Sequence, residues 1–242
     1  MVDSRRVLVI VPAWNEEKNV AATVGEILAT VDYDVVVVDD GSTDETANRA
    51  REAGAVVLDL PFNLGVGGAM RAGFVYARRH GYDVAIQVDA DGQHNPADID
   101  RVLAGLEHAD ISIGARFADT GDYHVRGPRW WAMRFLSGVL SRLTKTRLTD
   151  VTSGFRAANS RAINQYVHYY PAEYLGDTID SLVAAIHAGL RVTQVPVAMR
   201  QRVHGVPSQN PVGATIYLGR SVFALGLALV RRPRVQQLER VA

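Results

Sequence analysis

The stretch Val84-Ala-Ile-Gln-Val-Asp-Ala-Asp91 decides the fold, because a short apolar run ends directly at two aspartates. Val84–Val88 has the length and apolar character of a strand buried within a sheet. Three similar runs precede it along the chain: Val7–Val11, Val35–Val38 and Val56–Leu58. Helical segments are expected between these runs, so strand and helix alternate four times. This alternation predicts an α/β fold with a doubly wound, mostly parallel sheet and flanking helices in a single domain.

The helices of the first half are expected from spacing and from starting signals. Glu16–Thr30 places Val20, Val24 and Ile27 on one face. Ser42 and Glu45 match a capping box and predict a helix through about Ala53. A glycine-rich loop is expected over residues 63–68, followed by a helix over 69–80.

The second half of the chain has a less regular pattern. A polar loop is expected over residues 117–130. Strands are expected at 111–113, near 154–156 and at 192–199, and helices at 131–143 and 178–188. No repeat or linker divides the chain, so we expect one main domain over residues 1–211 and a C-terminal apolar helix with a basic tail over 212–242.

Composition limits the classes of function. The 242 residues are 48% hydrophobic and contain 26 basic and 26 acidic side chains. A balanced charge gives no overall field for nucleic acid, so an anionic ligand needs a local site, and no nucleic-acid partner is expected. The chain has no cysteine, which excludes disulfides and thiolate metal sites. A cytoplasmic location is expected, with possible peripheral contact at the inner face of the membrane.

Polar residues follow each of the expected strands. The carboxyl ends of parallel strands form the edge at which such sheets bind ligands. Pro12–Glu16, Asp39–Ser42, Asn63–Gly68 and Asp89–Gln93 are therefore expected to converge on one crevice.

Asp89 and Asp91 are the strongest candidates for chemistry. Two carboxylates two residues apart at a strand end can both reach one hard cation, Mg²⁺ or Mn²⁺. Such a cation neutralises charge that grows on a diphosphate leaving group. The alternative is an exposed acidic turn, because Asp-x-Asp alone is common.

Three weaker features accompany this pair. Asp39 and Asp40 are expected to include an acceptor for a base or ribose, although a polar turn with Ser42 as a cap is the alternative. The glycine-rich loop fails the G-x-G-x-x-G pattern because Met70 holds the third glycine position. Four arginines stand near the expected anion sites: Arg116, Arg156, Arg200 and Arg202.

Four motifs in this order resemble the family 2 inverting glycosyltransferases of the GT-A fold. They are Pro12-Ala-Trp-Asn-Glu16, Val38-Asp-Asp-Gly-Ser-Thr-Asp44, Asn63-x-Gly65 and Asp89-Ala-Asp-Gly-Gln-His94. Within that family, Gly154-Phe-Arg156 and Val195-Pro-Val…Arg202-x-x-Gly205 are similar to the polyprenyl- and dolichyl-phosphate sugar synthases.

The resemblance implies a role for each matching position. The nucleotide-sugar donor would be bound by Pro12, Asn15, Glu16, Asp39, Asp40, Asn63, Asp89 and Gln93. Asp91 would be catalytic and, together with Asp89, would hold Mg²⁺ or Mn²⁺. Asp180 stands where relatives often carry Glu and would be the second catalytic residue. The acceptor phosphate would face Arg116, Arg156 and Arg202.

Several functions remain open at the level of the sequence. The expected reaction is inverting transfer of a sugar from a nucleoside diphosphate sugar to an acceptor, here polyprenyl phosphate at the membrane surface. A soluble or glycan acceptor, a sugar-phosphate nucleotidyltransferase and a non-catalytic nucleotide-sugar-binding protein are the alternatives. Ala214–Val230 is apolar but short and contains Arg220, which fits an interfacial helix; packing on the sheet or in a homo-oligomer is the alternative.

Overall fold

The structure is a computed structural model that describes residues 5–115, 128–171 and 177–200. Within these residues, seven strands form one sheet in the order β3-β2-β1-β4-β6-β5-β7. Their bounds are β1 Val7–Ala13, β2 Asp34–Asp39, β3 Val56–Asp59, β4 Val84–Gln87, β5 Ile111–Ala115, β6 Arg156–Asn159 and β7 Val192–Pro196. Strand β6 runs antiparallel to β4 and β5, and the other pairings in this sheet are parallel.

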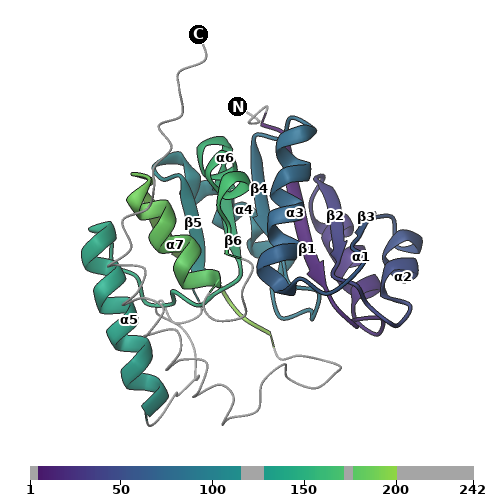
Figure 1. Ribbon diagram of the computed structural model, residues 1–242, viewed down its shortest axis with the longest axis horizontal. Helices are drawn as coiled ribbons and strands as arrows, with labels where there is room; N and C mark the ends of the chain where they lie inside the picture. Colours follow the sequence, from purple (N-terminus) through teal and green to yellow (C-terminus); the bar gives the residue numbers. More distant parts are fainter. Residues whose placement is uncertain (1–4, 116–127, 172–176, 201–242) are drawn as a thin grey trace.

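Helices cover both faces of the sheet (Figure 1). Their bounds are α1 Val20–Thr30, α2 Thr46–Glu52, α3 Gly65–Arg79, α4 Ile99–Ala104, α5 Pro128–Thr144, α6 Ser160–His168 and α7 Asp177–His187. Short 3-10 turns flank α4 at Pro96–Asp98 and Gly105–Glu107. The expected α/β architecture with a mostly parallel sheet is therefore confirmed.

The alternation of side chains along the strands builds two separate cores. Leu8 and Ile10 face the layer of α3, α5, α6 and α7, whereas Val7, Val9 and Val11 face the layer of α1, α2 and α4. Successive strand residues point to opposite faces, so a continuous apolar run supplies both layers. This is why Val7–Val11 and Val35–Val38 carry no polar alternation.

The expected starts of the three helices in the first half were wrong. Helix α1 begins at Val20 instead of Glu16, because the backbone N–H of Glu16 donates to Thr46 Oγ1 at 2.8 Å and belongs to a tied loop. The capping box does not form: α2 begins at Thr46, and the Ser42 hydroxyl donates to Asp39 Oδ1. Helix α3 begins at Gly65, inside the stretch expected to be a loop.

Two helices, α4 and α6, have no counterpart among the sequence expectations. They span only six and nine residues, respectively, too short for spacing alone to mark them. Residues 128–130 are helical, where a polar loop was expected, because α5 begins at Pro128. Residues 117–127 of that expected loop lie outside the described part of the chain, as does the segment 212–242.

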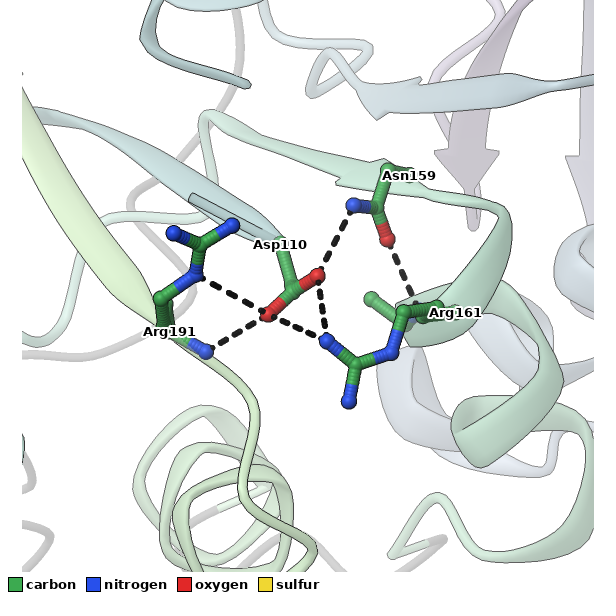
Figure 2. A network of polar contacts seen from close by, with 5 residues as sticks. Asp110, Asn159, Arg161 and Arg191 are labelled. Atoms are coloured by element: carbon green, nitrogen blue, oxygen red, sulfur yellow. Dashed lines mark hydrogen bonds and ion pairs between the residues drawn. The ribbon is translucent and has the colours of Figure 1, made fainter. Parts of the chain in front are cut away.

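A buried carboxylate fastens the amino ends of β5 and β7 to the end of β6 (Figure 2). Asp110 is 2% exposed and accepts hydrogen bonds from Asn159 Nδ2 at 3.0 Å and from the Arg191 backbone N–H at 2.8 Å. Arg161 Nη1 donates to the same carboxylate at 3.1 Å. This cluster lies at the edge opposite the carboxyl ends of the parallel strands, so it supports the sheet at a distance from the candidate site.

Candidate functional site

The loops after β1 and β2 form one hydrogen-bonded unit. The Asn15 N–H donates to Ser42 Oγ at 2.9 Å, and the Asn15 side-chain carbonyl accepts from the Thr43 N–H at 2.9 Å. Asn15 has a φ of 54°, a left-handed conformation that asparagine tolerates better than most residues. The Glu17 N–H donates to Asp44 Oδ2 at 3.2 Å. The two loops therefore present a shared and tied wall at the carboxyl edge.

The two aspartates that end β2 take different positions. Asp39 is 2% exposed, and its Oδ1 accepts from the N–H and the hydroxyl of Ser42. Asp40 turns the other way and accepts from the Leu64 N–H at 2.7 Å, at the start of α3. Asn63 Oδ1 accepts from the Gly65 N–H at 3.0 Å at the same helix start.

Burial sets the electrostatics of Asp40. Desolvation raises the pKa of this carboxyl above its ordinary value, and the charge of Asp39 acts in the same direction. Hydrogen bonds from the backbone N–H groups of Leu64 and Gly65 oppose the rise without cancelling it. Asp40 therefore joins β2 to the amino end of α3, a structural contact that the sequence interpretation as a nucleotide ligand did not include.

Asp89 follows Val88 just past the end of β4, and it is held by Gln87 of that strand and by His94 of the turn that follows. Gln87 Nε2 donates to Asp89 Oδ1 at 2.8 Å. His94 Nδ1 accepts from the Asp89 backbone N–H at 3.0 Å, which places the ring proton of a neutral imidazole on Nε2. That Nε2 lies 3.7 Å from Asp89 Oδ2. The side chain of Asp89 is still 38% exposed, so it remains open to a ligand.

Asp91 follows in a turn that several elements brace. Its Oδ1 accepts from the Gln93 N–H at 3.1 Å, and Gly92 has a φ of +74°. Thr23 of α1 donates its hydroxyl to the Ala90 carbonyl at 3.0 Å. The Gln93 carbonyl accepts from the Arg200 N–H at 2.9 Å, which joins the chain after β7 to this turn.

Of the four arginines that the sequence placed near anion sites, two are bonded within the protein and two lie outside the described residues. Arg200 is engaged within the protein, because it donates to Glu26 Oε1 and Asn95 Oδ1, each at 2.6 Å. Arg156 is 7% exposed and donates to the carbonyls of Ser153, Val151 and Thr178 at 2.7, 2.5 and 2.8 Å. These contacts make Arg156 a brace between β6 and α7, which differs from the expected acceptor role. Arg116 and Arg202 lie outside the described residues.

Asp180 lies in the first turn of α7. Its Oδ2 accepts from the Tyr169 hydroxyl at 3.4 Å, just past the end of α6. The start of α7 is fastened beside β6 by the contact between Arg156 Nη1 and the Thr178 carbonyl. The structure thus places Asp180 on the helix layer of the second half, in the end of α7 that lies beside the start of β6.

Four residues around the site were not assigned roles from the sequence. Gln87 and His94 hold Asp89, Gly154 packs against its carboxylate, and Trp14 is 51% exposed in the loop after β1. Trp14, His94 and Gly154 lie within quoted motifs, so their signal was present. The approach of Gly154 to Asp89 and the stacking of His94 on Phe155 join segments far apart in the chain, which spacing cannot show.

The carboxylates of Asp89 and Asp91 suit a hard divalent cation whose remaining coordination positions are filled by a bound ligand and water. Mg²⁺ is commonly held by one or two carboxylates together with substrate phosphates and water. Within residues 5–115, 128–171 and 177–200, no cluster of three or more His, Asp or Glu side chains forms a complete metal cage. A site with two carboxylates and an exposed Asp89 suits a cation that arrives with a diphosphate.

In the described part of the chain, no helix is both long and apolar enough to cross a membrane. The apolar segment Ala214–Val230 lies outside that part.

Comparison with known proteins places this geometry in a family. Residues 8–167 match glycosyl transferase family 2. The chain is 35% identical over 211 residues to an undecaprenyl-phosphate mannosyltransferase of Micrococcus luteus, covering 83% of this chain and 86% of the relative. It is 33% identical over 225 residues to a polyprenol monophosphomannose synthase of Mycolicibacterium smegmatis, covering 86% and 82%.

Solved structures agree on the fold. A glucosyl-3-phosphoglycerate synthase from Mycobacterium tuberculosis, in complex with phosphoglyceric acid, superposes with a TM-score of 0.71 at 20% identity, covering 96% of this chain and 82% of the other. A complex of the same enzyme with Mn²⁺, UDP and glucosyl-3-phosphoglycerate gives a TM-score of 0.70 at 20% identity and the same coverage. The match over residues 8–167, the sheet with one reversed strand and the aspartate pair after β4 together establish that this chain belongs to glycosyl transferase family 2.

Proposed function

We propose that the chain is a metal-dependent, inverting glycosyltransferase that uses a nucleoside diphosphate sugar and passes the sugar to a polyprenyl phosphate at a membrane surface. The observation that carries the donor half is the placement of Asp89 and Asp91 at the end of β4. There they stand at the same sheet edge as the tied loops after β1 and β2.

The donor is assigned along that edge. Pro12, Asn15, Glu16 and Asp39 line the nucleoside, because they end the adjacent parallel strands β1 and β2. Asp89 and Gln93 face the diphosphate, and Asp89 and Asp91 would hold Mg²⁺ or Mn²⁺. The cation supplies positive charge where negative charge grows on the leaving diphosphate.

The transfer forms one bond and breaks one bond. An acceptor oxygen attacks the anomeric carbon, while the bond from that carbon to the donor phosphate oxygen breaks and the nucleoside diphosphate leaves. A phosphate monoester has a second pKa of about 6, so it is largely ionised near neutral pH and needs little help from a base. A hydroxyl acceptor would need a positioned carboxylate, for which Asp180 is the candidate.

The acceptor assignment is supported by the relatives at 35% and 33% identity, whose names refer to undecaprenyl phosphate and polyprenol. Arg116 and Arg202 remain the candidate phosphate ligands.

One assay tests the donor and the acceptor separately. Purified chain is incubated with UDP- and GDP-sugars and Mn²⁺, with and without a short polyprenyl phosphate, and nucleoside diphosphate release is measured. We expect release that depends on both the metal and the lipid phosphate. Nucleoside diphosphate release with soluble acceptors, and none with the lipid phosphate, would refute the proposed acceptor. If no donor is bound and none releases its nucleoside diphosphate, the proposed glycosyltransferase activity is refuted.

A further inference from the structure

Gly154 stands directly across from Asp89. Strands β4 and β6 are antiparallel, and Ile86 pairs with Ala157. The same register, continued by three residues, sets Asp89 opposite Gly154. Residues opposite each other in an antiparallel pair direct their side chains to the same face. A side chain at position 154 would therefore enter the space of the Asp89 carboxylate.

The distances show how little room exists at this point. A Cβ atom added to Gly154 would lie 3.1 Å from Asp89 Oδ2, 3.2 Å from Asp89 Oδ1 and 2.8 Å from Gln87 Nε2. Gly154 is not among the residues with positive φ, so its backbone conformation suits any L-residue. The contact with the carboxylate and the Gln87 amide is therefore the structural reason for glycine.

The backbone on the side of Gly154 cannot easily retreat. Phe155 is fully buried, its carbonyl accepts from the Gly114 N–H at 2.8 Å, and its ring stacks on His94 with centroids 4.8 Å apart. Arg156 is pinned by three backbone carbonyls. The shortest of these contacts is to Gln87 Nε2, which itself donates to Asp89 Oδ1, so an added methyl group would displace the Gln87 amide together with the partly exposed Asp89 carboxylate.

We propose that Gly154 is a positioning residue for the transfer reaction: the absence of a side chain there lets the Asp89 carboxylate remain where Gln87 and His94 hold it. This inference rests on the proposed role of Asp89 in binding the donor diphosphate and its metal. Gly154 leaves room beside the Asp89 carboxylate, the Gln87 amide donates to Asp89 Oδ1, and His94 Nδ1 accepts from the Asp89 backbone N–H. The carboxylate is thus oriented before the donor arrives.

The test compares Gly154→Ala with Gly25→Ala in the full chain. Gly25 lies in α1, and a Cβ there would meet no heavy atom within 4 Å, so this variant controls for the glycine-to-alanine change. We expect Gly154→Ala to lower kcat/KM by about 100-fold, the scale of a misplacement of about 1 Å in a reacting site. We also expect a higher Mn²⁺ concentration for half-maximal activity and a smaller rise in melting temperature on adding UDP or GDP with Mn²⁺.

A second variant keeps the test decisive if Gly154→Ala does not fold. Gln87→Met keeps the buried volume but removes the N–H that holds Asp89 Oδ1. Because a hydrogen bond to a charged group is lost, we expect kcat/KM to fall about tenfold, with the same change in Mn²⁺ dependence. Wild-type values for a folded Gly154→Ala, or for Gln87→Met when only that variant folds, would overturn the inference and leave the proposed function intact. A wild-type chain that neither binds nor cleaves any donor would instead refute the proposed function, and with it the role assigned to Asp89.

Discussion

At the scale of single residues, Asp91 offers the most direct test of the metal. Asp91→Ala should abolish transfer, because Asp89 alone would not hold the cation. Without the cation, the positive charge that stabilises the leaving diphosphate is lost. Its folding should be little affected, since the turn is also braced by the contact from Thr23 to the Ala90 carbonyl. Nucleoside diphosphate release and thermal melting would be measured beside Asp32→Ala, a change at an exposed loop residue. Full activity of Asp91→Ala in the presence of a chelator would rule out the metal role.

Trp14 is a second residue with a separable effect. Its side chain is half exposed at the end of β1, beside the wall assigned to the nucleoside. Stacking of a base on an aromatic side chain contributes about 1–3 kcal/mol. We expect Trp14→Ala to raise the donor KM by about tenfold with a small change in kcat. Phe135→Ala, at an equally exposed aromatic residue on α5, should leave the donor KM unchanged. Equal KM values for both variants would remove Trp14 from the donor site.

At the scale of elements, the start of α3 depends on a carboxylate supplied by β2. Asp40→Ala removes the acceptor of the Leu64 N–H and should lower the free energy of unfolding by about 1 kcal/mol, as loss of a helix cap does. Asp40→Asn keeps an acceptor and removes the charge, so the two variants separate hydrogen bonding from electrostatics.

The pH dependence of Asp40→Asn has a definite sign. The pKa of Asp40 is raised in the folded state by desolvation, so the folded chain holds this proton to a higher pH than the unfolded chain does. Wild-type stability is therefore reduced as pH rises from the ordinary pKa of 3.8 through the folded value. Urea unfolding should show Asp40→Asn gaining relative to wild type between pH 4 and pH 7. A constant difference across that range would show that the carboxyl is not desolvated.

At the scale of the whole molecule, the carboxylate of Asp110 joins three strands of the second half (Figure 2). Burial alone would raise the pKa of Asp110, but the hydrogen bonds from Arg191 and Asn159 and the charges of Arg161 and Arg191 lower it. Its stabilisation is present above the unfolded pKa and is lost as pH falls through the folded pKa. Asp110→Asn should cost about 2 kcal/mol at pH 7, by leaving buried groups unpaired, and less in acid. Urea unfolding at pH 7 and pH 3 measures both values, with Asp32→Asn as control.

Membrane association is also a property of the whole chain. If the segment after Pro211 forms an interfacial helix, the full chain should co-sediment with anionic liposomes and a chain ending at Pro211 should not. The basic cluster Arg231, Arg232 and Arg234 would add about 1 kcal/mol of attraction per charge, so binding should weaken in high salt. Both chains remaining in the supernatant, with no transfer to polyprenyl phosphate, would refute the membrane interpretation and favour a soluble acceptor.

The sequence predicted the first four strands and the edge on which polar residues gather, because apolar runs and strand-end aspartates are local signals. It did not predict that Ser42 would bind Asp39 instead of capping α2, or that α3 would begin at Gly65. Arg156 was expected to meet a phosphate and lies instead among three carbonyls. Ser42 also accepts from the Asn15 N–H, the start of α3 is bound by Asp40, and Arg156 reaches Thr178. These three contacts join segments more than 20 residues apart, and spacing along the sequence does not show them.

The reversed direction of β6 has a consequence for how tolerant this protein is of insertions and deletions. Because β6 runs against its neighbours, residues that precede it, and not those that follow it, reach the same edge as the aspartates after β4. A shift of one residue in the pairing of β4 with β6 would put Phe155 or Ser153 opposite Asp89 and would exchange the residues of β6 that face the two cores. An insertion or deletion in the segment 151–155 would move Gly154 away from its position opposite Asp89. Changes in the length of this segment should therefore be tolerated far less well than changes in the loop between α1 and β2.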